Sequence, residues 1–123
     1  GLAGFAVFTL APNLGLPPEL PTMPAADLTD RQIWWVATVL LTATGLGATV
    51  FGKIAIIKIL GLALIALPHI WGAPHASGDS DIPPELAAQF AASTIVISAL
   101  FWVMIGYFSS LAFNWIGHKQ QKI

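Results

Sequence analysis

The residues Leu67-Pro68-His69-Ile70-Trp71-Gly72-Ala73-Pro74-His75 mark the point where a long apolar run gives way to a polar, acidic segment. Pro68 removes a backbone donor near the end of the expected helix, and Pro74 keeps that helix from resuming. Trp71 is a side chain of the kind that settles between lipid and water. The stretch therefore predicts the edge of a membrane-spanning helix, with two histidines at that edge.

The composition of the chain places it in a lipid bilayer. Of its 123 residues, 56% are hydrophobic and only 9% are charged, whereas a soluble domain carries about 25% charged residues. The formal net charge of -1 offers no basic face for nucleic acid. The lack of cysteine excludes disulfides and thiolate chemistry. The sequence predicts an all-α integral membrane protein that forms one transmembrane helical domain over residues 1–123.

Four apolar segments define the expected topology. Three are long enough for full transmembrane helices, and they cover about 33–51, 54–71 and 86–116. The segment 1–14 is long enough for only half a span, which indicates a fragment of a longer polytopic chain. Acidic loops are expected at 15–30 and 72–85. Thr29 and Gln32 fit a capping box before the first full span, and Trp34 and Trp35 are expected to anchor its start in the interface.

Small and hydroxyl residues recur at helical spacing in two of the expected spans. The first set is Thr38, Thr42, Gly45 and Thr49, and the second is Gly106 and Ser110. Each set lies on one helical face, and helices in lipid associate through such faces because their backbones can approach closely. We interpret both sets as packing surfaces. For the first set, a threonine-lined permeation path is the alternative.

Charge is divided between the two sides of the membrane. Because successive spans alternate in direction, the two acidic loops share one side, and all six Asp and Glu residues lie there. Four of the five Lys and Arg residues fall on the other side, at Lys53, Lys58, Lys119 and Lys122. By the positive-inside rule, the lysine turn and the C-terminal tail are cytoplasmic and the acidic loops are outside.

The outer side combines imidazole and carboxylate groups. His75, Asp79 and Asp81 come from one short loop, and His69 lies at the adjoining helix end. Such ligands suit borderline divalent cations such as Co²⁺, Ni²⁺ or Zn²⁺. Two interpretations stay open, namely a metal site and a solvated acidic loop on the side from which lysine is excluded. No catalytic motif is present in the sequence, so we expect neither an enzyme nor a bound cofactor.

Six blocks of the sequence form a distinctive set. They are Gly1-Leu-Ala-Gly-Phe, Leu10-Ala-Pro-Asn-Leu-Gly-Leu-Pro-Pro-Glu-Leu-Pro, Met23-Pro-Ala-Ala-Asp-Leu, Arg31-Gln-Ile-Trp-Trp, Leu67-Pro-His-Ile-Trp-Gly-Ala-Pro-His and Ile82-Pro-Pro-Glu-Leu-Ala-Ala-Gln-Phe. Together they resemble the CbtA family of predicted cobalt-transporter subunits, over almost the whole chain. The family looks to have more spans than are present here, which again indicates a missing front end.

The resemblance implies a multi-pass protein of the bacterial cytoplasmic membrane that takes part in cobalt uptake, with Co²⁺ as the transported ion. It implies a small CbtB-like subunit as partner. By position it adds Glu85 to His69 and His75 as candidate metal ligands, whereas Asp79 and Asp81 lie in a stretch that does not match. The alternative function is a non-transporting structural or accessory subunit docked to a larger membrane protein complex.

Overall fold

The computed structural model describes residues 1–120, with side chains up to residue 117, so the expected basic residues Lys119 and Lys122 of the tail lie outside the described side chains. Every regular element in this part of the chain is helical. In chain order the elements are α1 (Leu2–Phe5), η1 (Ala6–Leu10), α2 (Ala11–Gly15), α3 (Leu28–Phe51), α4 (Ala55–Trp71) and α5 (Pro84–Gln120). The predicted all-α class is therefore confirmed.

The first three elements run on from one another as a single helical segment. Its middle, η1, is a π-helix that ends just before Pro12 in α2. Proline cannot donate to the carbonyl four residues earlier, and its ring crowds that carbonyl. A wider turn immediately before Pro12 relieves this crowding and lets the helix continue. The segment ends at Gly15, one residue beyond the predicted half-span.

Helix α3 begins earlier than the sequence pattern predicted. Its N-cap is Asp27, whose side chain accepts hydrogen bonds from the backbone N–H groups of Thr29 at 2.8 Å and Asp30 at 3.4 Å. The proposed capping box, with Thr29 as N-cap, was therefore wrong, and the helix begins two residues earlier than that box predicted, ahead of the apolar span expected from residue 33. An aspartate carboxylate satisfies the free N–H groups of the first turn as well as a threonine hydroxyl does, and it also complements the helix dipole.

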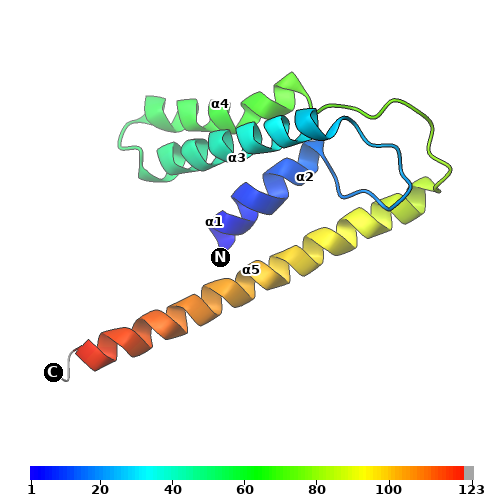
Figure 1. Cartoon of the computed structure of the whole chain (residues 1–123). Coiled ribbons are helices and arrows are strands. Elements are labelled where there is room, and N and C mark those ends of the chain that lie inside the picture. The colour runs from blue at the N-terminus through cyan, green and yellow to red at the C-terminus, as the bar shows by residue number, and fades with distance from the viewer. Residues whose placement is uncertain (121–123) are drawn as a thin grey trace.

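Helices α3 and α4 form an antiparallel hairpin joined by a short turn that carries Lys53 (Figure 1). The two backbones meet at Gly45 and Gly61. A Cβ atom on Gly45 would stand 2.5 Å from the carbonyl oxygen of Gly61, and one on Gly61 would stand 2.5 Å from Thr49 Oγ1. Thr49 Oγ1 in turn donates to the carbonyl of Gly45 at 2.8 Å. Glycine is required at this crossing because the helices approach to backbone contact.

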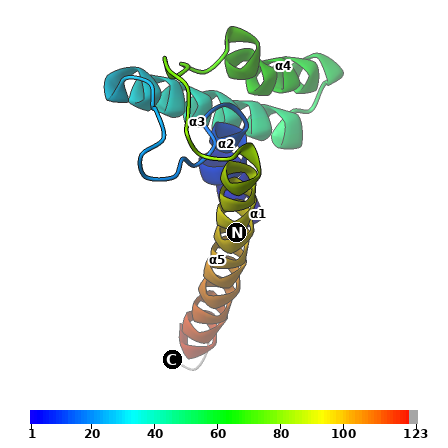
Figure 2. The same ribbon diagram turned by 90° about the vertical axis from the view of Figure 1, so that its right-hand side faces the viewer.

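Helix α5 stands apart from the hairpin, and its axis makes a steep angle with α3 and α4 (Figure 2). It packs mainly against α1 and η1. Trp102 is the centre of this contact. Its ring stacks on Phe8 with centroids 5.9 Å apart, its Nε1–H donates to Thr9 Oγ1 at 3.1 Å, and its edge lies against Gly4.

Two helices of the described chain are long and apolar enough to cross a membrane by length and composition. They are α3, Leu28–Phe51, and the part of α5 over Pro84–Gly117. Helix α4 has 17 residues, which rise about 26 Å against a hydrocarbon core of about 30 Å, so the expected count of three full spans is not confirmed. Leu2–Gly15 and α4 are shorter apolar helices.

Candidate functional site

Residues 67–75, which include His69 and His75, lie beside the start of α3. This is the end of the hairpin that carries the acidic loops. The two loops adjoin each other there, because a Cβ atom on Gly78 would stand 3.9 Å from Pro24 Cβ (Figure 1). The turn with Lys53 lies at the opposite end of the hairpin. The acidic residues of both loops are thus gathered at one end of the molecule.

A groove of about 530 Å³ opens between α3 and the end of α4. Its walls are mostly apolar, and its lining includes Trp34, Ala37, Leu67, Pro68, Trp71 and Pro74. Asp30 supplies a carboxylate to the lining. The local sequence explains this shape, because α4 stops at Gly72, whose φ of 91° turns the chain away from the helix axis.

Trp34 is the buried centre of this end, and its predicted role as an interface anchor was wrong. Only 8% of its surface is exposed. Its ring lies directly against Gly15 of α2, close to Ala73 in the loop that follows α4. It also meets the His69 ring in an edge-to-face arrangement with centroids 6.0 Å apart. Trp34 shares a helical face with Thr38, and this periodicity is the signal that the sequence analysis missed.

His69 is the one candidate metal ligand that the structure holds in a defined setting. It is half-buried, it belongs to the last turn of α4, and Trp34 limits its orientation. The other candidate ligands are exposed, and they are His75, Asp79, Asp81 and Glu85. Within the described residues, no group of three or more His, Cys, Asp and Glu side chains is close enough to hold a metal ion. The folded chain therefore presents one half-buried imidazole, held against Trp34, beside a loop whose carboxylates are exposed.

The inner face of the hairpin is polar at the same end. Thr38 and Thr42 are 0% and 3% exposed, and their hydroxyl oxygens have no hydrogen-bond partner among the described residues. The buried Nε1 of Trp34 likewise has none. Pro68 is buried in α4, and it leaves the Leu64 carbonyl without its usual helical donor. Unpaired polar groups in a buried seam carry a desolvation cost.

The residues expected to pack helices together differ in how closely they approach another helix. Gly45 is buried at the crossing of α3 and α4, and Thr49 adjoins Gly61 there. On α5, a Cβ atom on Gly106 would stand 3.2 Å from the Cα of Gly1. Ser110 is exposed. Of the two expected packing residues of α5, Gly106 therefore lies at a close contact, whereas Ser110 does not.

Comparison with known proteins adds an identity to this geometry. No curated protein and no solved structure matches the chain. The family model described as "Probable cobalt transporter subunit (CbtA)" matches residues 1–114, nearly the full length of the chain. This match covers the hairpin, both acidic loops and most of α5. The chain belongs to the CbtA family, whose members are described as probable cobalt transporter subunits.

Proposed function

We propose that the chain is a membrane subunit of a cobalt or related divalent-cation uptake system, and that it gathers ions at an outer rim. The outer rim consists of His69, His75, Asp79, Asp81 and Glu85. Membership of the CbtA family is the observation that carries this proposal. It is a transport role rather than an enzymatic one, with Co²⁺ as cargo.

The chemistry of the outer rim suits the first step of uptake. Imidazole nitrogen is a good ligand for Co²⁺, and carboxylates attract the hydrated ion electrostatically. A small number of protein ligands at the entrance is compatible with transport, because an ion that is bound too tightly is not released to the next site. His69 is the best placed of these residues, since Trp34 and Pro68 hold it at the end of α4 whereas His75 lies in a loop.

The proposed orientation places the outer rim outside the bacterial cytoplasmic membrane and the Lys53 turn in the cytoplasm. The positive-inside rule supports it, because lysines flank one end of the hairpin and carboxylates the other. A subunit implies a partner, and a small CbtB-like membrane protein is the partner that we propose. Ions would pass from the outer rim to a path formed with that partner.

Uptake measurements test the role of the outer rim. Cells producing the His69→Ala variant should accumulate about tenfold less cobalt than cells with the parent protein, because an oriented ligand is lost. His75→Ala should have a smaller effect, and Asp79→Asn the smallest. Ile70→Ala is the matched control, since Ile70 is the adjoining residue in α4 and is 79% exposed. It should leave uptake unchanged.

The double variant His69→Ala/His75→Ala decides between the two functions considered for this chain. If cobalt accumulation is unchanged at matched protein level, the outer rim is not a metal site. That result would favour a structural or accessory subunit of a larger membrane complex.

Labelling of single cysteines tests the orientation and the number of spans. The chain has no cysteine of its own, so each introduced thiol is unique. Ser77→Cys should react with an impermeant reagent from outside, whereas Lys53→Cys and Gln121→Cys should react only after the membrane is opened. Reaction of Lys53→Cys from the same side as Ser77→Cys would show that α4 does not span.

A further inference from the structure

A second groove lies on the first turns of α3, and it is lined by Leu16, Leu28, Arg31, Gln32, Trp35 and Val36. Its volume is about 530 Å³, and it shares no lining residue with the groove beside Pro68. Leu28, Trp35 and Val36 are all exposed large hydrophobic side chains. The groove therefore combines open apolar walls with one cationic side chain.

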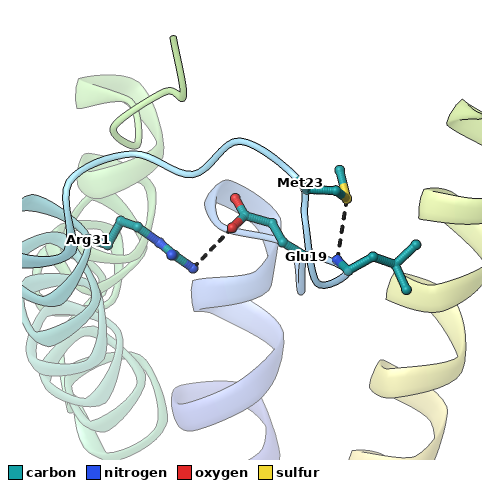
Figure 3. A network of polar contacts seen from close by, with 4 residues as sticks. Glu19, Met23 and Arg31 are labelled. Atoms are coloured by element: carbon teal, nitrogen blue, oxygen red, sulfur yellow. Dashed lines mark hydrogen bonds and ion pairs between the residues drawn. The ribbon is translucent and has the colours of Figure 1, made fainter. Parts of the chain in front are cut away.

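Arg31 is the only Lys or Arg in the sequence before Lys53. Its Nη2 lies 3.4 Å from Glu19 Oε2, and the guanidinium reaches from α3 towards the loop that carries Glu19 (Figure 3). A tight charge-assisted hydrogen bond of this kind measures about 2.7–2.9 Å, so the ion pair is loose. The buried Nε of Arg31 has no partner among the residues that the structure describes.

The pair offers one positive and one negative group side by side at the edge of a membrane span. Arg31 and Glu19 are both partly buried, with 31% and 24% of their side chains exposed. A guanidinium binds phosphate oxygens in a bidentate manner, and a carboxylate binds an ammonium group. Gln32 adds amide donors to the groove. The indole of Trp35, one turn further along α3, suits the layer between headgroups and acyl chains.

We propose that this groove binds a zwitterionic phospholipid with a primary ammonium headgroup, phosphatidylethanolamine. Its phosphate binds Arg31, its ammonium group binds Glu19, and the upper parts of its acyl chains lie on Val36, which is further along α3 towards the membrane core. Charge complementarity selects this occupant. An anionic headgroup would pair with Arg31 but would meet Glu19 as a like charge, and a trimethylammonium headgroup has no N–H to donate. The proposal is independent of cation transport.

Native mass spectrometry of the purified protein tests the site. After exchange into micelles with equal amounts of phosphatidylethanolamine, phosphatidylglycerol and phosphatidylcholine, the parent protein should retain the ethanolamine lipid about fivefold to tenfold over either competitor. Arg31→Gln should abolish retention of all three lipids. Glu19→Gln should reverse the preference between the first two, because Arg31 is then free to hold an anionic headgroup without a like charge beside it.

Asp30→Asn is the matched control. It removes one negative charge from the residue next to Arg31, but Asp30 lines the groove beside Pro68 rather than this one, and it does not form the ion pair with Arg31 that Glu19 forms. The preference for the ethanolamine lipid should therefore persist. Thermal unfolding of each variant distinguishes loss of lipid binding from loss of the folded state. If Arg31→Gln is unstable, Glu19→Gln still tests the site, because it leaves the Arg31 guanidinium in place. Equal retention of the three lipids by the parent protein, or an unchanged preference in Glu19→Gln, would overturn the proposal.

Discussion

Alanine at position 45 is expected to force α3 and α4 apart. The new Cβ atom would stand 2.5 Å from the Gly61 carbonyl oxygen and 2.7 Å from Ile65 Cγ1. The oxygen belongs to a helix backbone and cannot rotate away, so the two helices have to separate. Overpacking of this kind costs about 1–3 kcal/mol. Thermal unfolding in detergent should therefore show a clear loss of stability. Gly61→Ala should behave in the same way, since it meets Thr49 Oγ1 and the Gly45 carbonyl.

Gly47→Ala is the control for this prediction, because it makes the same chemical change two residues away. A Cβ atom at Gly47 meets nothing within 4 Å. Alanine is favoured over glycine inside a helix by about 0.5–1 kcal/mol, so this variant should be as stable as the parent or slightly more stable. Equal melting temperatures for the Gly45→Ala and Gly47→Ala variants would rule out backbone contact at the hairpin crossing.

Replacing Trp102 by alanine is expected to release α5 from the N-terminal helical segment. The change removes the stacked pair with Phe8, worth about 0.5–1.5 kcal/mol, and the hydrogen bond to Thr9, worth about as much again. These contacts matter most because, among the described residues, α5 packs mainly against α1 and η1. Gly4→Leu should have a similar effect from the other side, since the Trp102 ring already occupies the space beside Gly4.

Spin-label distances measure this release. Labels on cysteines introduced at Leu14 and Val103, two exposed positions, should give a narrow distance distribution in the parent protein and a broad one in Trp102→Ala. Phe113→Leu serves as the control, because Phe113 is also an aromatic residue of α5 but is 79% exposed. Its distribution should match the parent. A narrow distribution in the Trp102→Ala variant would mean that other contacts hold α5.

The positions of the helices could be predicted from the sequence, and their exact ends could not. The predicted segments 54–71 and 86–116 correspond to Ala55–Trp71 and Pro84–Gln120. Helix α3 starts after Asp27 rather than after Thr29, because both are good N-cap residues and only the folded backbone shows which one is used. Hydrophobic run length also could not distinguish a full span from the 17-residue α4.

The candidate site was less predictable than the fold. The sequence pointed to His69 and to the carboxylates of the acidic loop, but it contained no sign that the His69 ring would meet Trp34. Two adjacent tryptophans before an apolar run are typical of interface anchors. One of them, Trp35, is exposed, whereas Trp34 is buried against Gly15 and the His69 ring. Helical phase separates the two residues by about 100°, and only the packing of α3 on α2 and α4 decides which one points inward.

The sequence by itself determined that this chain is an apolar, all-α protein of the CbtA family with its acidic loops at one end. The apolar character and the helical class follow from composition and run length, which act over a few residues, and the family follows from the match of the sequence itself. Only the tertiary structure shows that the backbones meet at Gly45 and Gly61 and that Trp102 packs α5 against the N-terminal helical segment. It also shows that Arg31 forms an ion pair with Glu19. Such contacts join residues far apart in the chain. They depend on the relative rotation and crossing of whole helices, which no local pattern specifies.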